Sequence, residues 1–200
     1  MCGRYYVDDD TAKEIEKIIR QVDEKLRKEA EKCISLQPED IHPTDTAPVL
    51  VASNRKISYR WQRWGFPGFQ GKQVIFNARS ESVLEKKMFR DSVQRRRIVV
   101  PATAFYEWNA NKEKNIFYRQ DKSILFMAGF YNNYQDDDRF VILTTAANKS
   151  MQPVHDRMPL ILEPEEIEPW IFDDSETQKI LSKTPCLLGR RAEYEQLSLF

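Results

Sequence analysis

A series of short apolar runs between residues 49 and 145 is the feature that most constrains the fold. The runs are rich in Ile, Val, Phe, Tyr and Trp and are bounded by Gly, Pro, Asn or Asp, a pattern typical of strands joined by turns. The expected strands are Val49–Ala52, Ile57–Phe66, Val74–Phe76, Ile98–Val100, Ala104–Trp108, Asn115–Arg119, Ile124–Tyr131 and Phe140–Thr145. Such a succession predicts a largely antiparallel or barrel-like sheet.

Helices are expected on either side of this strand-rich region. Thr11–Cys33 carries apolar residues at helical spacing, and Thr11 with Glu14 fits a capping box. Two shorter helical segments are expected near Glu163–Phe172 and Glu176–Lys183. A chain of 200 residues, 41% of them hydrophobic, is long enough for one domain with a substantial core. The expected fold class is therefore α+β in a single domain.

Composition excludes several classes of protein. No window approaches 18 consecutive apolar residues, so no membrane span is expected, and residues 1–10 lack the apolar core of a secretory leader. The three cysteines, Cys2, Cys33 and Cys186, are sparse and lack metal-type spacing, so we expect no metal or cofactor and a reducing, cytoplasmic location. Formal net charge is zero, which excludes a polycation but not a local basic surface.

Charge is unevenly distributed along the chain. Residues 54–99 hold 12 Lys and Arg against three acids, whereas residues 163–176 hold seven acids and no base. One interpretation is two solvated faces that cancel each other. The other is a basic groove for a polyanion, with an acidic face elsewhere.

Cys2 directly follows the initiator methionine. A small second residue usually permits removal of that methionine, which would make Cys2 the N-terminal residue. Its α-amine would then have a pKa of about 7.7–8.0 beside a thiol of about 8.5. Such an amine can attack an aldehyde to give an imine, and the thiol can close on the imine carbon to form a thiazolidine. The alternative is a cysteine that is second by chance.

Three further positions carry candidate chemistry. Asn77 follows an expected strand, and Glu107 lies inside the aromatic run Phe105–Trp108. Strand alternation places Glu107 on the face of Phe105, which predicts a partly buried carboxylate suited to proton transfer, or else an acid at a sheet edge. His155 lies between two prolines beside Arg157, and a lone histidine is often structural. Nucleophile, acid and histidine together form a plausible set for covalent catalysis.

Four blocks in this order resemble one family. They are Met1–Arg4, Asn77–Glu81, Phe105–Trp108 and His155–Pro159, and the matching part runs from residue 2 to about 162. Together they are similar to the SOS response-associated peptidase family, whose fold is a bifurcated sheet with a barrel-like core and surrounding helices. Each block alone is weak evidence for the family, but four blocks in the same order are a specific match.

The resemblance implies a protein that captures abasic sites in single-stranded DNA as a thiazolidine, with lyase-type chemistry, in the DNA damage response. It implies that Cys2 is the nucleophile, that Asn77 holds the Cys2 terminus and that Glu107 moves protons. His155 would assist at the sugar hydroxyl or promote β-elimination. Three arginines would contact flanking phosphates, because their planar forks suit that group: Arg4, Arg79 and Arg157. The peptidase in the family name suits self-directed removal of Met1.

Two aromatic residues are candidates for stacking on DNA bases. The stretch Trp64–Phe69 matches a place where the family often has a tryptophan pair, so Trp64 and Phe69 are the expected stacking residues. Stacking on an aromatic side chain contributes about 1–3 kcal/mol per base. Phenylalanine in the second position would weaken this contribution without abolishing it.

The C-terminal residues resemble a short peptide that binds the bacterial sliding clamp. Leu197, Leu199 and Phe200 would fill an apolar pocket while Gln196 bonds to its rim. The alternative is a tail packed on its own domain. We therefore expect a domain over 1–195, a separate tail at 196–200, and a monomer.

Two other functions remain open from the sequence. An N-terminal-nucleophile amidohydrolase, such as a glutamine amidotransferase, would use the Cys2 amine as base and the thiol to attack an amide. Glutaminase activity would identify it. A non-catalytic module for single-stranded DNA would bind without Cys2 and without an abasic site.

Overall fold

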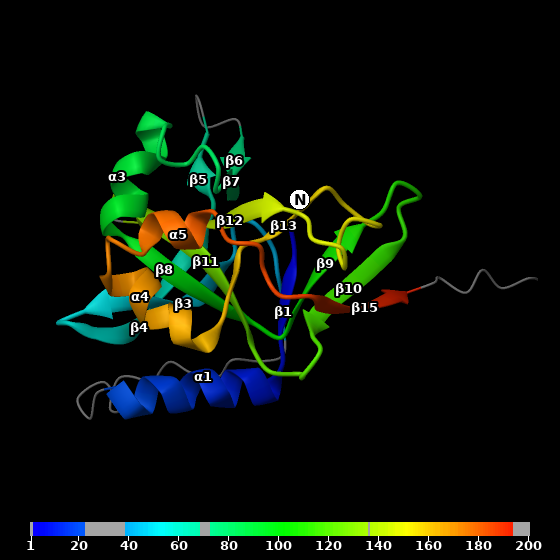
Figure 1. Ribbon diagram of the computed structural model, residues 1–200. Coiled ribbons are helices and arrows are strands. Elements are labelled where there is room, and N and C mark those ends of the chain that lie inside the picture. Colours follow the sequence, from blue (N-terminus) through cyan, green and yellow to red (C-terminus); the bar gives the residue numbers. More distant parts are fainter. Residues whose placement is uncertain (1, 23–38, 69–72, 136, 194–200) are drawn as a thin grey trace, which may run out of the picture.

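The computed structural model describes residues 2–22, 39–68, 73–135 and 137–193. At its centre a ring of five strands closes on itself in the order β12–β4–β3–β8–β11–β12 (Figure 1). The strands are β3 (Thr46–Ser53), β4 (Lys56–Trp64), β8 (Arg97–Ala102), β11 (Leu125–Tyr134) and β12 (Asp137–Ala146). Only the β12–β4 pair in this ring is parallel. The predicted barrel-like, mainly antiparallel sheet is confirmed.

A second sheet diverges from the ring at Thr103. Its five strands run in the order β15 (Leu188–Glu193), β10 (Lys114–Arg119), β9 (Ala104–Trp108), β1 (Tyr5–Val7) and β2 (Glu39–Ile41). Thr103 is the single residue between β8 and β9, and its N–H donates to the Tyr6 carbonyl at 2.8 Å. Its hydroxyl accepts from the Asp8 N–H at 2.9 Å. These bonds hold the chain at the point where it passes from one sheet to the other, which is the expected bifurcation.

Short strands extend the ring beside β12 and β11. β7 (Asn77–Arg79) pairs in parallel with one part of β12, and β13 (Arg157–Pro159) pairs antiparallel with β12. β14 (Ile161–Leu162) pairs with β11, while β5 (Phe66–Pro67) and β6 (Val74–Ile75) form a small hairpin. The sequence blocks that contain Asn77 and Arg157, which are distant in sequence, therefore both pair with β12.

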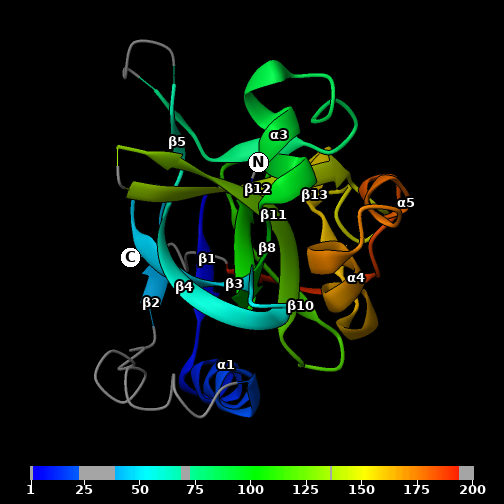
Figure 2. The same ribbon diagram turned by 90° about the vertical axis from the view of Figure 1, so that its left-hand side faces the viewer.

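Helices cover the sheets on several sides. α1 (Asp9–Val22) lies beneath the ring, away from the N-terminus, and α3 (Lys87–Arg95) lies near the opposite end (Figures 1 and 2). The remaining ones are the 3-10 helix η2 (Pro164–Glu166), α4 (Ile167–Phe172) and α5 (Thr177–Leu181). Within the described ranges, no helix has the length and apolar composition needed to cross a bilayer.

The start of α1 corrects one expectation. Asp8, and not Thr11, caps the helix, because its carboxylate accepts the Thr11 N–H at 2.8 Å. The Thr11 hydroxyl instead shares a 2.7 Å hydrogen bond with Thr103. Residues 23–33 of the expected helix lie outside the described residues. The two C-terminal helical segments are confirmed, with α4 and α5 inside their expected ranges.

Candidate active site

Cys2 lies just before β1, and its position is set by the strands on both sides. β1 pairs with β2 on one side and with β9 on the other. The side chain is 1% exposed, and its Sγ donates to the Arg4 carbonyl at 3.7 Å. Burial, followed by the nearby Glu107 carboxylate, raises the pKa of the Cys2 thiol. The thiol is therefore protonated at neutral pH, and its reaction needs a base.

Asn77 holds the backbone of Cys2 from a strand 75 residues away. Its Nδ2 donates to the Cys2 carbonyl at 2.8 Å. Asn77 begins β7, where the parallel register with β12 places it opposite Ile142. Its Oδ1 is buried and accepts no hydrogen bond from the described residues. The Asn77 side chain therefore holds the Cys2 backbone through Nδ2, and its Oδ1 remains a hydrogen-bond acceptor beside Cys2.

Glu107 lies on β9 and is 4% exposed, as strand alternation with Phe105 predicts. Its strand is sandwiched between β1 and β10, where Glu107 is opposite Asn115. The Arg4 carbonyl accepts both the Cys2 thiol and the N–H of Tyr106, the neighbour of Glu107, so the two buried side chains lie close to one another. The structure therefore brings together Cys2, which precedes β1, Asn77 of β7 and Glu107 of β9.

His155 lies in the loop between β12 and β13. Its imidazole Nδ1 accepts the Arg157 N–H at 2.9 Å and is 2.8 Å from the Asp156 carboxylate. The side chain is a quarter exposed. The loop enters β13, which flanks β12 opposite Ala146 and Thr144.

Arg157 joins two of the sequence blocks. Its terminal nitrogens bind both oxygens of Glu81 at 2.6 and 2.8 Å, and one of them also donates to the Thr144 carbonyl at 2.7 Å. This contact lowers the pKa of Glu81, because the guanidinium stabilises the carboxylate. The side chain is only 11% exposed. The expectation that Arg157 contacts phosphate is therefore corrected: its fork is committed to Glu81.

Arg4 and Arg79 differ from Arg157 in their surroundings. The Arg4 guanidinium lies 5.4 Å from the Trp108 ring centre and 3.7 Å from Asp40, and it is one third exposed. Arg79 is exposed, and no acid of the described ranges pairs with it. It lines a hollow of about 270 Å³ with residues of β6, β7 and α3: Ile75, Asn77, Ala78, Lys86, Met88 and Phe89. This hollow opens beside Asn77.

Trp64 is a core residue, which corrects its expected role in stacking on DNA. The indole is fully buried, stacks on Phe140 at 6.2 Å between ring centres, and donates its N–H to the Phe76 carbonyl at 2.9 Å. No face of the ring remains for a base. Phe69 and the tail residues 196–200 lie outside the described residues.

The basic stretch 54–99 does not form a single groove. Arg60 and Arg63 pair with Asp138 and Asp137 on β12. Arg97 is buried and bonds to backbone carbonyls of α3 and to Asp174. Only part of the surplus, including Arg79 and Lys86, lies beside the site. The expectation of one continuous basic groove over this stretch is therefore wrong.

Sequence reasoning missed two elements that shape the site. β1, which follows Cys2, is only three residues long and is too short for a periodic signal. α3 could have been found from Phe89 and Val93, which are four residues apart and buried. Tyr5 was also missed: its hydroxyl is buried, and burial, Cys2 and Asp45 raise its pKa. In the described residues, His, Cys, Asp and Glu form no group of three that could bind a metal ion.

The fold and the site together define a class of protein. It is a bifurcated, mainly antiparallel sheet with a closed ring, in which an asparagine and a buried carboxylate surround a cysteine at the start of the chain. Among solved structures, a protein from Bacteroides thetaiotaomicron covers 97% of this chain and 93% of its own, with a TM-score of 0.79 and 23% identity. A Bordetella bronchiseptica protein matches with a TM-score of 0.73 and 21% identity, over 96% of this chain and 100% of its own. These likenesses concern the fold.

The chain belongs to the SOS response-associated peptidase family, whose model matches residues 1–198. It is 31% identical over 159 residues to the abasic site processing protein YedK of Escherichia coli, covering 73% of this chain and 72% of that protein. It is also 31% identical over 152 residues to the abasic site processing protein YMR114C of Saccharomyces cerevisiae, covering 69% of this chain. The chain spans only 41% of that yeast protein.

Proposed function

We propose that this protein binds single-stranded DNA and captures abasic sites covalently on Cys2 after removal of Met1. One observation carries the proposal: Asn77 of β7 and Glu107 of β9 lie beside Cys2, which precedes β1. The names of the relatives, which are abasic site processing proteins, support the same substrate. The DNA would be protected from cleavage while the adduct persists.

The proposed reaction needs only the Cys2 amine, the Cys2 thiol and the aldehyde of the abasic site. The α-amine of Cys2 attacks the C1′ aldehyde of the ring-opened abasic sugar and gives a carbinolamine. Loss of one water leaves an imine. The Cys2 sulfur then adds to the imine carbon, and the thiol proton passes to the nitrogen. The product is a thiazolidine with a secondary amine, and reversal regenerates aldehyde and cysteine by adding back the water.

Glu107 would carry the protons in this sequence. The raised pKa of the Cys2 thiol means that sulfur addition requires removal of a proton from a neutral thiol. Glu107 is the carboxylate whose charge is felt at that thiol, so it is the group placed to accept the proton. When the carbinolamine collapses, the protonated form would donate to the departing hydroxyl.

The other residues would hold the participants in place. Asn77 fixes the Cys2 carbonyl, which orients the amine toward the aldehyde. His155 would assist at the sugar hydroxyl. Arg79 and Arg4 would contact flanking phosphates, because both are at least partly exposed at the edge of the site.

Incubation with an abasic oligonucleotide tests the proposal. The expected result is a heat-stable protein–DNA species that does not form when the aldehyde has first been reduced with borohydride. Failure of the wild-type protein to form any adduct would contradict the proposed function. Adduct formation by the reduced oligonucleotide would contradict the aldehyde chemistry.

A further inference from the structure

The loop that carries His155 is rigid because its own backbone closes it. The Ala147 N–H donates to the Asp156 carbonyl at 2.9 Å, which joins the two ends of the loop. Within it, the Met151 carbonyl accepts the N–H groups of Val154 and His155 at 2.9 and 3.1 Å. Met151 itself is fully buried. These bonds fix the shape of the loop, so its placement determines where the imidazole lies.

Asn148 attaches this loop to a segment near the C-terminal end of the described chain. Its Nδ2 donates to the carbonyls of Pro185 and Cys186 at 3.0 and 2.8 Å. Its Oδ1 accepts the N–H and the hydroxyl of Ser150 at 3.0 and 2.6 Å. The side chain thus uses both donors and both acceptor positions, and the residue is 8% exposed. A second bond between loop and segment runs from the Leu188 N–H to the Ser150 hydroxyl at 3.1 Å.

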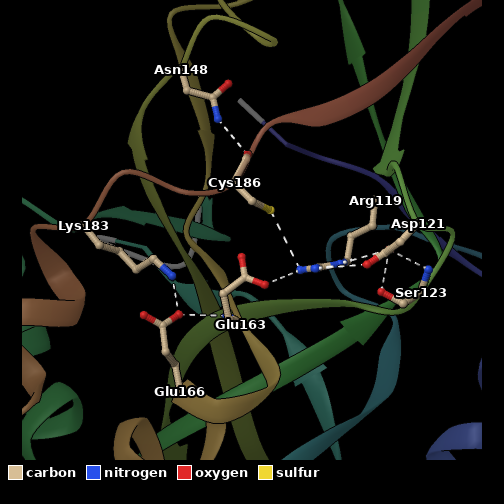
Figure 3. A network of polar contacts seen from close by, with 8 residues as sticks. All are labelled: Arg119, Asp121, Ser123, Asn148, Glu163, Glu166, Lys183 and Cys186. Atoms are coloured by element: carbon tan, nitrogen blue, oxygen red, sulfur yellow. Dashed lines mark hydrogen bonds and ion pairs between the residues drawn. The ribbon is translucent and has the colours of Figure 1, made fainter.

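The segment that Asn148 binds is itself fixed to the body of the protein (Figure 3). The Cys186 sulfur accepts from Arg119 of β10 at 3.8 Å, and Arg119 pairs with Glu163 at 2.8 Å. Lys183 pairs with Glu166 of η2, whose carboxylate also accepts the Glu163 N–H at 2.8 Å. The segment is therefore a stable reference against which the loop is placed.

We propose that Asn148 is a positioning residue for His155. By tying the loop to residues 185–186, it sets the place of the imidazole relative to the substrate bound at Cys2. Misplacement of a reacting group by about 1 Å can slow a reaction by about 10²-fold. The inference rests on the proposed function, because His155 acts on the sugar of the captured abasic site.

Asn148→Asp is the sharpest variant. It has the same shape and keeps both oxygen contacts to Ser150, so the first turn of the loop is preserved. It loses both hydrogen bonds to residues 185–186 and turns a carboxylate oxygen toward two carbonyl oxygens. Lys179→Met is the matched control, because it removes an exposed ion pair with Glu176 and touches neither the loop nor residues 185–186. Ser150→Ala is a milder second variant that loses the Leu188 bond.

The first readout is the rate of adduct formation on an abasic oligonucleotide. We expect Asn148→Asp to slow it about tenfold, Ser150→Ala to slow it less, and Lys179→Met to leave it unchanged. Binding of the reduced oligonucleotide should stay constant. In a His155→Ala background, Asn148→Asp should have no further effect, because a positioning residue acts only through its target. Equal slowing in both backgrounds would overturn the proposal.

The second readout does not depend on DNA chemistry. The chain has only two histidines, His42 and His155, so their ring signals can be resolved by NMR and assigned with His42→Ala. Asn148→Asp should shift the His155 signal and leave the His42 signal in place, which also shows that the variant is folded. An unmoved His155 signal would overturn the positioning role. Absence of adduct in the wild-type protein would contradict the proposed function and leave this NMR result standing.

Discussion

Cys2 and Cys186 are two thiols in different regions of one protein, and their comparison separates thiol acidity from function. Burial raises the thiol pKa at both positions, and a nearby carboxylate adds to the effect: Glu107 at Cys2 and Glu163 at Cys186. Cys186 also contacts an arginine and is more exposed. By thiol chemistry alone, Cys186 is the more accessible group. What sets Cys2 apart is an α-amine on the adjacent carbon once Met1 is removed.

The largest expected effect is the loss of adduct when Cys2 is changed. Cys2→Ala should form no heat-stable adduct with abasic single-stranded DNA, because the ring needs both amine and thiol. Cys186→Ala, the matched control, should form it at the wild-type rate. An undiminished yield of adduct with Cys2→Ala would contradict the assignment of Cys2 as the nucleophile. Gel mobility after heating measures the yield of adduct for both variants.

Glu107→Gln should slow adduct formation by about 10²-fold or more, because the amide cannot accept the thiol proton. The raised thiol pKa gives the sign of the pH dependence: the rate of the variant should rise as pH increases toward that pKa, since hydroxide then replaces the missing base. Glu113→Gln, in the turn between β9 and β10, is the control and should be neutral. Unchanged rates of formation and reversal in Glu107→Gln would remove its role.

Alkylation of the native protein sharpens the contrast between the two thiols. Iodoacetamide at neutral pH should label Cys186 several-fold faster than Cys2, because Cys2 is 1% exposed and protonated. Peptide mapping by mass spectrometry measures each site separately. Faster labelling of Cys2 would show that its thiol is activated in the free protein, contrary to the structure.

Arg79 should contribute a smaller effect through phosphate. Arg79→Gln should weaken binding to single-stranded DNA a few-fold and lower the salt slope by about 0.7, the value for one phosphate contact. Arg95→Gln, in the same basic stretch but paired with Asp91 on α3, should change neither. Equal losses in the two variants would indicate a diffuse basic surface and not a local contact. Fluorescence anisotropy at several salt concentrations makes the measurement.

The smallest expected effect on the chemistry comes from the tail. Removing residues 196–200 should leave adduct formation unchanged, whereas it should reduce recovery of the protein on an immobilised sliding clamp. Equal recovery with and without the tail would remove the proposed clamp contact.

Local rules predicted those parts of this structure that depend on neighbouring residues. Strand alternation predicted the burial of Glu107, and the apolar runs predicted the strands of the ring. The contact between Asn77 and Cys2 could not be derived in this way, because it depends on parallel pairing of β7 with β12 across 65 residues, from Asn77 to Ile142. The family resemblance supplied that pairing of roles; composition and spacing did not.

The positions of charged and aromatic residues in the sequence were poorer predictors of which side chains could contact DNA. Trp64 has the aromatic side chain expected of a residue that stacks on bases. In the structure, however, its indole fills part of the core, where it packs against Tyr5, Phe76 and Phe140. Arg97 belongs to the basic stretch and Arg157 was expected to contact phosphate, yet both are committed to acids within the fold. A sequence count cannot separate a guanidinium that faces solvent from one that holds two strands together.

Mass spectrometry of the digested adduct identifies the residue that is linked to DNA. The expected result is one modified peptide that begins at Cys2, lacks Met1, and carries the sugar remnant with the loss of one water. A linkage on Cys186 or on a lysine would contradict it. So would an adduct in which Met1 is still attached to Cys2, because no free α-amine would then be present to form the ring.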